Sequence, residues 1–509
     1  MPNAIAAFSG RGHARSSPPH GPDGAGSPPA AVVCWAALAA ITVAAVVLRA
    51  VFVGDQSLGY EEVFTRAVVT QPTLTGLWHG LKATESTPPL YYVLTWLWVK
   101  LSGSDSATAL RMISLVAGVV TVPVGFLAAR RFVGERLALV VAWLCAVSPI
   151  LVLYSIYARA YALLLLSCAL SLWALSALLE QPSRRRWLLW ALAAVVCLWT
   201  HYFSVFVLAG EVAVLAVRLP RERPALGLSL VAVAAATIPL WSLFRAQSGD
   251  SERTAYIAAE PITGRLEGIV RQFAMGTNVP AAWLEGAGIA LVTLAVLYTL
   301  WRGRRSESTL ALAAIVVVGA GVPILGALTR IDDHLLPRNV LGTWICLAPL
   351  AAYGLTRLRA LPLAAYSVIC VATVIAVQSN WRYQGSTDWS GASARIQARA
   401  AGEPVAVMPG IELQVAALYL RRAPLAAPLS TRDLWVMVEP ARGAGERALN
   451  PVADPPLAAL WGASFHAVAE IDYRGFRLIH LHASAPVAIA PAPADNGPIS
   501  APNAFVLSP

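Results

Sequence analysis

Two adjacent carboxylates at residues 61 and 62 are the first side chains in the sequence that point to chemistry. Glu61 and Glu62 lie in Gly59-Tyr60-Glu61-Glu62, a few residues after a long apolar segment. Charged groups close to a bilayer are costly and are by default functional. An apolar surround raises the pKa of a carboxyl, so a glutamate held there can act as general base on a hydroxyl group. A solvated pair of loop carboxylates is the alternative interpretation.

Two arginines are candidates for binding a phosphate group. Arg159 lies in Ala158-Arg159-Ala160 between two apolar segments, and Arg338 precedes another apolar segment. A guanidinium group can bind phosphate oxygens in a bidentate manner. Arg159 is alternatively an arginine that extends its charged end toward a membrane interface.

Aromatic and imidazole side chains occur in the same connecting segments. Tyr91 and Tyr92 follow two prolines and could hydrogen-bond a headgroup or a sugar, although tyrosines are also common at membrane interfaces. Tyr161 follows Arg159 by two residues, and His201 lies between two further apolar segments. A lone histidine is more often structural than functional. We expect these four side chains to line a cavity beside the arginines.

The sequence favours no metal or nucleotide cofactor. It contains no P-loop pattern, no glycine-rich dinucleotide fingerprint and no D-x-D pattern. Asp332, Asp333 and His334 could ligate a divalent metal, but a solvated loop is the favoured interpretation. No cofactor is required by these residues, and the place of a divalent metal stays open.

Composition indicates that membrane helices position these groups. Of the 509 residues, 57% are hydrophobic and 13% are charged, and the mean hydropathy is +0.62. A soluble protein carries about 25% charged residues. The net charge of +10 comes mostly from arginines in short connections between apolar segments. This placement follows the positive-inside rule and argues against nucleic-acid binding.

Eleven apolar segments predict membrane spans, each needing about 20 residues to cross the bilayer. They cover residues 31–53, 108–129, 136–153, 161–180, 187–200, 203–218, 225–244, 284–301, 309–329, 339–356 and 361–378. Arginine clusters occupy alternate connections, at residues 130–136, 184–186, 218–223, 302–305 and 357–359. These connections are therefore expected in the cytoplasm, and the candidate residues on the opposite, outer side.

The apolar stretch Pro89–Leu101 does not fit this alternation, because one added span would invert every later connection. We predict a re-entrant or interfacial helix there, rich in tryptophan and tyrosine. A full span compensated by a missed one is the alternative. The predicted total is about 11 to 13 spans.

The sequence divides into four parts. Residues 1–30 are predicted to form a disordered cytoplasmic tail, and residues 31–379 the membrane domain. Residues 380–483 alternate helix and strand patterns that end in a hairpin at Arg474-Gly475, so they predict a small extracytoplasmic α/β domain. Residues 484–509 are predicted to be a disordered Ala/Pro-rich tail.

The order of these motifs resembles the GT-C glycosyltransferases, in particular the bacterial branch of the protein O-mannosyltransferase and aminoarabinose transferase family. The resemblance covers about residues 31–380. The motifs, in chain order, are Glu61-Glu62, Pro88-Pro89-Leu90-Tyr91-Tyr92, Ala158-Arg159-Ala160-Tyr161, Thr200-His201-Tyr202-Phe203 and Pro337-Arg338-Asn339. It implies a GT-C membrane fold in the bacterial cytoplasmic membrane. It also implies an inverting transferase that moves a sugar, a hexose or a pentose, from a polyprenyl-phosphate carrier to an acceptor hydroxyl on the outer face.

The resemblance also implies roles for single residues. Glu61 would be the base and Glu62 its helper, while Arg159 and Arg338 would hold the phosphate. The sequence departs from the family pattern where Glu61 replaces an aspartate and Thr87 replaces a histidine before two prolines. The acceptor could be a protein, a lipid or a glycan. A lipid-linked sugar transporter, a surface-glycan polymerase or ligase, and a non-catalytic assembly protein are the alternatives.

Overall fold

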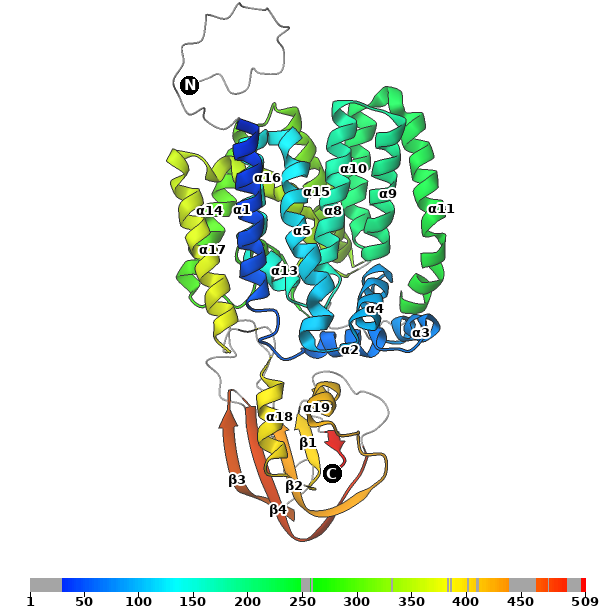
Figure 1. The fold of residues 1–509 in the computed structure, drawn as a ribbon, viewed down its shortest axis with the longest axis vertical. Coiled ribbons are helices and arrows are strands. Elements are labelled where there is room, and N and C mark those ends of the chain that lie inside the picture. The colour runs from blue at the N-terminus through cyan, green and yellow to red at the C-terminus, as the bar shows by residue number, and fades with distance from the viewer. Residues whose placement is uncertain are drawn as a thin grey trace, which may run out of the picture.

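The chain folds into a bundle of helices and a smaller sheet domain below it (Figure 1). The computed structural model describes residues 30–248, 257, 260–330, 333–381, 384, 387–400, 402–408, 412–438, 464–474, 476–491 and 505–509. The tail predicted for residues 1–30 lies outside these residues except for Ala30, where the first helix begins.

Each of the eleven segments predicted to span the membrane contains a helix. These helices are α1 (Ala30–Ala50), α5 (Ala107–Val133), α6 (Glu135–Val147) with α7 (Pro149–Ser155), α8 (Tyr161–Glu180), α9 (Arg184–Thr200), α10 (Ser204–Arg218), α11 (Arg223–Ser248), α14 (Ala282–Arg302), α15 (Glu307–Thr329), α16 (Trp344–Leu355) and α17 (Leu361–Ser379). An amphipathic helix that was not predicted, α13 (Ile262–Met275), precedes α14.

The bundle is that of a multi-pass membrane protein. Among the described residues, seven helices are long and apolar enough to cross a bilayer, namely α1, α5, α8, α11, α14, α15 and α17. The pair α6–α7 makes an eighth if its 57° bend is counted as one broken span. Helices α9, α10 and α16 are shorter, with 17, 15 and 12 residues. The number of crossings therefore stays a prediction.

The bend between α6 and α7 has a local cause. Pro149 provides no backbone N–H, so the helix cannot continue its hydrogen bonds across this point. The carbonyls of Cys145 and Ala146 instead accept hydrogen bonds from the guanidinium of Arg49, both at 2.9 Å. Arg49 is fully buried at the end of α1. Its charge is satisfied by these carbonyls and by Ser155 Oγ, 3.0 Å away.

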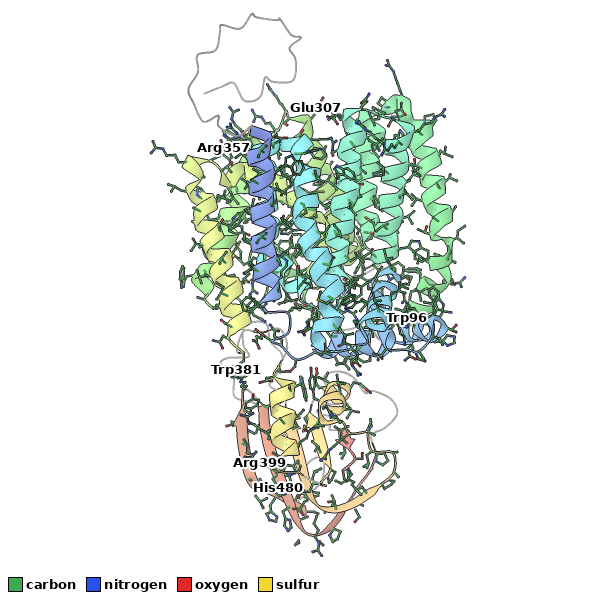
Figure 2. All side chains as sticks on the ribbon, viewed as in Figure 1. Trp96, Glu307, Arg357, Trp381, Arg399 and His480 are labelled. Carbon is green, nitrogen blue, oxygen red and sulfur yellow. The ribbon has the colours of Figure 1, made fainter. Side chains whose placement is uncertain are left out.

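The arginine-rich connections gather at one end of the bundle. Arg131 Nε donates to Glu180 at 2.9 Å, which joins the ends of α5 and α8, and Arg218 at the end of α10 pairs with Glu307 at the start of α15. Glu307 and Arg357 lie at the end opposite to Trp96 and the sheet domain (Figure 2). The end of the bundle on the side of Trp96 and the sheet domain is called the sheet-facing end below.

Three helices that connect α1 to α5 cover the sheet-facing end. They are α2 (Tyr60–Val69), α3 (Leu74–Thr84) and α4 (Leu90–Ser102). α2 and α3 run across the end of the bundle (Figure 1). α4 corresponds to the stretch predicted as re-entrant or interfacial, and its 13 residues are too few for a span of about 20. Gln247, near the end of α11, donates to the carbonyls of Leu81 and Thr87, both at 3.2 Å, and so anchors this layer.

The sheet domain is a five-stranded mixed sheet with two helices on one face. Its elements are α18 (Trp389–Gln397), β1 (Val405–Met408), α19 (Leu413–Leu420), β2 (Leu429–Val438), β3 (Phe465–Tyr473), β4 (Phe476–Ile489) and β5 (Phe505–Leu507). The strand order is β3-β4-β2-β1-β5, with β1 and β2 parallel and the other pairs antiparallel. Trp435 and Met437 face α18 and α19, and Leu434 and Val436 face the other side, as the two-residue period of a strand requires.

The prediction of a disordered tail over residues 484–509 is wrong in part. β4 continues to Ile489, and β5 pairs with β1 at the edge of the sheet. Val506 and Leu507 are buried at this edge. Residues 492–504, between the two strands, lie outside the described residues.

Hydrogen bonds attach the sheet domain to the connection between α1 and α2. The Leu58 amide donates to Tyr419 Oη at 2.6 Å, and the Ser390 amide donates to Ser57 Oγ at 3.1 Å. α19 also packs against α2. Because Glu61 and Glu62 follow this connection directly, the sheet domain helps to fix the position of the predicted site.

Candidate functional site

Glu61 lies in the first turn of α2, where the helix end favours a negative charge. Its carboxylate accepts a hydrogen bond from Arg338 at 2.9 Å and one from Tyr157 Oη at 3.3 Å. Arg159 Nε lies 3.6 Å from the same group. The side chain is 26% exposed, so the carboxylate is held by cations and still reachable.

The two predicted phosphate-binding arginines meet at this carboxylate. Arg159 comes from the connection between α7 and α8, and Arg338 comes from the short 3-10 helix Pro337–Asn339. They are separated by almost 180 residues in sequence, yet both contact Glu61. Arg338 is 28% exposed and Arg159 is 11% exposed. Arg338 is therefore the more accessible cation for an incoming anion.

Glu62 faces away from Glu61 and is fully buried. Arg111 binds its two carboxylate oxygens at 2.8 and 2.7 Å. The amides of Ala158 and Gly59 add hydrogen bonds at 2.8 and 3.0 Å. The sequence predicted Glu62 as a second catalytic carboxylate. These contacts instead give it a structural role, because all four donors belong to the protein and its side chain has almost no exposure.

A third carboxylate, Glu85, was missed by the sequence analysis. It is buried and accepts hydrogen bonds from Arg159 at 2.8 Å and from Tyr92 Oη at 2.6 Å. Thr87 Oγ1 lies 2.9 Å from Tyr92 Oη. The signal in the sequence was its place two residues before Thr87-Pro88-Pro89, in the same connection as Glu61. Glu85 therefore holds Arg159 through its Nη1, while Glu61 lies next to its Nε.

The four side chains predicted to line a cavity are more buried than expected. Tyr91 and Tyr92 have no exposure, and the Tyr91 hydroxyl bonds to Ser114 Oγ at 3.0 Å. Tyr161 and His201 are 5% and 3% exposed, with ring centres 5.8 Å apart. Tyr92 therefore binds Glu85, and Tyr91 connects α4 to α5. Tyr161 and His201 pack against each other near the two arginines.

The charges of this cluster fix the ionisation of its members. Burial alone would raise the pKa of Glu61, but the guanidinium groups of Arg338 and Arg159 lower it below the usual value. For Glu85, burial outweighs the effect of Arg159, and the pKa is raised. Burial, together with the two arginines, lowers the pKa of His201 to about 3. His201 is therefore neutral at physiological pH and adds no positive charge.

A separate ion pair holds the segment that carries Arg338. Arg265 on α13 pairs with both carboxylate oxygens of Asp333, and Asn339 donates to the His334 carbonyl at 2.6 Å. The Arg265 bonds and the charge of Arg265 lower the pKa of Asp333. Asp333 and His334 had been considered as metal ligands together with Asp332, which lies outside the described residues. The Arg265 pair gives Asp333 a different partner.

An apolar cavity of about 330 Å³ lies next to this segment. It is formed by residues of α10, α15 and the flanking connections, namely Phe203, Phe206, Val322, Pro323, Leu325, Gly326, Thr329 and His334. Phe203 also contacts the rings of His201 and His334. The cavity therefore adjoins the polar cluster, and its lining is suited to a hydrocarbon chain.

Comparison with known proteins agrees with the fold. Residues 86–244 match the family described as dolichyl-phosphate-mannose-protein mannosyltransferase, a range that includes Arg159 and His201 and excludes Glu61 and Arg338. ArnT from Cupriavidus metallidurans in the apo state is similar, with a TM-score of 0.57 and 13% identity over 89% of this chain and 98% of that chain. The same protein bound to undecaprenyl phosphate gives a TM-score of 0.54 and 14% identity, with the same coverage. No curated protein sequence matches the chain.

The family match and these structural likenesses confirm the predicted similarity to the GT-C superfamily. They also confirm the fold class, a GT-C-like helical membrane protein with a small C-terminal sheet domain.

Proposed function

We propose that this protein is an inverting glycosyltransferase that moves a sugar from a polyprenyl-phosphate carrier to an acceptor hydroxyl at the sheet-facing end. The observation that carries the proposal is the position of Glu61. A reachable carboxylate contacts two arginines at one end of a membrane bundle, and His334, close in sequence to Arg338, lines an apolar cavity. The proposed base and phosphate site would therefore lie near a place for a lipid chain.

In this mechanism Glu61 receives the proton of the acceptor hydroxyl while the hydroxyl oxygen bonds to the anomeric carbon of the sugar. The bond between that carbon and the phosphate oxygen breaks, and the electron pair leaves with the polyprenyl phosphate. Attack from the face opposite to the phosphate inverts the anomeric centre. Arg338 and Arg159 stabilise the charge on the leaving phosphate. Each of these steps uses only protein side chains.

The ion pair between Glu61 and Arg338 links donor binding to the strength of the base. In the unliganded site Arg338 lowers the pKa of Glu61, which makes the carboxylate a weak base. A donor phosphate competes with Glu61 for the Arg338 guanidinium, because both are anions that bind through charged hydrogen bonds. Binding of the donor therefore releases Glu61 and raises its pKa before the proton is transferred.

The arginine-rich connections support one orientation of the chain in the membrane. These lie at the end opposite to Glu61, and short connections rich in arginine are retained in the cytoplasm. We therefore place the N-terminus in the cytoplasm of a bacterial cell and the sheet domain outside. The acceptor, a protein, a lipid or a glycan, would approach from that side.

A lipid-linked sugar transporter is the main alternative from another functional class. Such a protein needs charged or polar groups along a path through the membrane. Among the described residues, Glu211 is a buried acid within α10, but Ser171 and Trp190 satisfy it at 2.8 and 2.7 Å. The charges that contact one another around Glu61 lie at one end of the bundle, which favours chemistry at that end over transport.

The test compares two isosteric variants of the full chain in membranes supplied with polyprenyl phosphates carrying labelled hexoses or pentoses. Glu61→Gln removes the base, and Glu307→Gln removes an exposed carboxylate at the opposite end as the matched control. We expect Glu61→Gln to lower the transfer rate by about 10²- to 10⁴-fold, the range that general base catalysis contributes. Undiminished transfer by Glu61→Gln would remove Glu61 as the base.

A further inference from the structure

A second group of ionisable side chains lies in the sheet domain, far in sequence from the cluster around Glu61. Glu403, Asp433 and His480 each present one ligand atom, and these atoms all lie within 4.8 Å of one another. His480 Nε2 is 3.2 Å from Asp433 Oδ1 and 3.8 Å from Glu403 Oε2. The three side chains are between 23% and 33% exposed, so solvent ions can reach them.

The strand register brings these residues together. Trp435 of β2 pairs with His480 of β4, and Asp433 pairs with His482 two residues along, so all four side chains lie on one face of the sheet. Glu403 reaches the same face from the residues just before β1, which runs parallel to β2. Figure 2 places His480 on the part of the sheet domain remote from the helical bundle.

Two neighbours hold the three side chains in position. The Trp435 ring stacks on His480 with centres 4.8 Å apart and planes 3° apart, and its Nε1–H donates to Glu403 Oε2 at 2.6 Å. His482 Nδ1 lies 2.8 Å from Asp433 Oδ1. The Asp433 carboxylate is therefore fixed beside His480 by a neighbour that is not itself one of the three side chains.

We propose that Glu403, Asp433 and His480 form a binding site for a divalent transition-metal ion, with Zn²⁺ as the best match. Bond lengths of about 2.0–2.2 Å in a tetrahedral zinc site separate neighbouring ligand atoms by about 3.4 Å. The two separations from His480 Nε2, 3.2 and 3.8 Å, bracket this value. Three protein ligands leave the fourth position to water.

The ligand types select this class of ion. Calcium takes six to eight oxygen ligands, and magnesium prefers waters and carboxylates in an octahedral arrangement. An imidazole with two carboxylates suits zinc and related transition metals. In many metal sites, hydrogen bonds from neighbouring side chains orient the ligands. Trp435 orients Glu403 through a hydrogen bond and His480 through ring stacking, and His482 is hydrogen-bonded to Asp433.

The metal would connect three parts of the sheet domain. It would join the residues before β1 to β2 and β4, which otherwise meet through the hydrogen bonds of the sheet. A ligand that binds only the folded state stabilises it in proportion to the logarithm of its concentration over Kd. The site is separate from Glu61 and needs no step of the proposed transfer reaction.

The test measures Zn²⁺ binding to the purified full chain in detergent micelles after removal of bound metal with a chelator. Isothermal titration with zinc chloride gives the stoichiometry and Kd, and a thermal melt with and without zinc gives the stabilisation. The variants are Asp433→Asn and, independently, Glu403→Gln. The matched control is Asp472→Asn, an exposed aspartate of β3 outside the group. Circular dichroism and size exclusion establish that each variant is folded.

We expect one zinc equivalent in the wild type and in the control, with a rise in melting temperature. Each ligand variant should weaken this binding by at least about tenfold, the lower limit seen even for outer-shell changes. Trp435→Phe keeps an aromatic ring beside His480 and removes the N–H bond to Glu403, so it should weaken binding by about tenfold without unfolding the domain. Equal zinc affinity of the wild type, Asp433→Asn and Glu403→Gln would overturn the proposal. So would the absence of a saturable equivalent in the wild type.

Discussion

Replacement of Glu62 by glutamine should destabilise the protein, whereas the same replacement of its neighbour Glu61 should remove activity. Glu62 accepts four hydrogen bonds, two on each carboxylate oxygen, from Arg111 and from the amides of Ala158 and Gly59. All four partners are donors. A glutamine amide placed in either orientation sets its own N–H groups against two of these donors, and it leaves the buried Arg111 charge without its counter-ion.

The size of the effect follows from the burial of the pair. Arg111 and Glu62 are 3% and 1% exposed, so water does not replace the lost partner. Breaking a buried ion pair from one side costs about 3–5 kcal/mol. The remaining carbonyl partners of Arg111, those of Val53, Gln56 and Ser57, keep part of its hydrogen bonding. The lower half of that range is therefore expected.

The assay is denaturation of the purified chain in detergent, followed by tryptophan fluorescence, together with transfer activity per folded molecule. Glu62→Gln should unfold at a lower denaturant concentration and keep activity within about tenfold of the wild type. Glu61→Gln should lower stability less than Glu62→Gln, because the Glu61 side chain is 26% exposed, and should lose about 10²- to 10⁴-fold in rate. Wild-type stability of Glu62→Gln combined with loss of transfer would refute the structural role and return Glu62 to the reaction.

Three further predictions concern the segments around Glu61. Arg338→Ala should raise KM for the polyprenyl-phosphate donor by at least about tenfold, since a hydrogen bond between charged groups contributes about 1.5–3 kcal/mol; an unchanged KM would contradict a phosphate role. The acid limb of kcat/KM should lie below about pH 4.3 in the wild type, because the net pKa shift of Glu61 is downward, and Arg338→Ala should move that limb to higher pH. The ion pair of Arg265 and Asp333 should stabilise the fold at any pH above the ordinary aspartate pKa of about 3.9, and this stabilisation should be lost as the pH falls through the lowered pKa of Asp333. Asp333→Asn should abolish that part of the pH dependence of unfolding.

The helical part of the fold could be predicted because its signals are local and long. Each apolar segment of about 20 residues determines a helix wherever it packs. The sheet domain was also predicted in outline, including the hairpin between β3 and β4, because period-two alternation is visible in short stretches. The composition of residues 484–489 and 505–507 did not reveal the strands that they form. Alanine and proline suggested a tail there, yet Val506 and Leu507 complete the sheet by pairing with β1, about 100 residues earlier in the sequence.

The site was harder to predict than the fold, because charge pairing depends on distant residues. Glu61, Arg159 and Arg338 could be grouped only by assuming that alternate connections share one end of the bundle. Glu61 and Glu62 are adjacent in the sequence. The sequence did not show that Glu61 would contact Arg159 and Arg338 while Glu62 would contact Arg111. The partner of Glu62, Arg111, looked like an ordinary residue near the start of a span. Glu85 was overlooked because its partners, Tyr92 and Arg159, had been assigned to a ligand.

The balance of charges would let the proposed base and the proposed phosphate site lie side by side. Glu61 and Glu85 face Arg159 and Arg338, so the unliganded cluster carries two negative and two positive groups near the membrane. A phosphate added to this cluster leaves an excess of negative charge. Glu85 is the group with a raised pKa, and it accepts a hydrogen bond from Tyr92, so a proton on Glu85 could offset part of that excess. Arg159, bonded to Glu85, would then be released toward the phosphate together with Arg338. Glu61, which is ionised before the donor binds because its pKa is lowered there, would then accept the proton of the hydroxyl. In the proposed reaction the two glutamates would therefore play different parts.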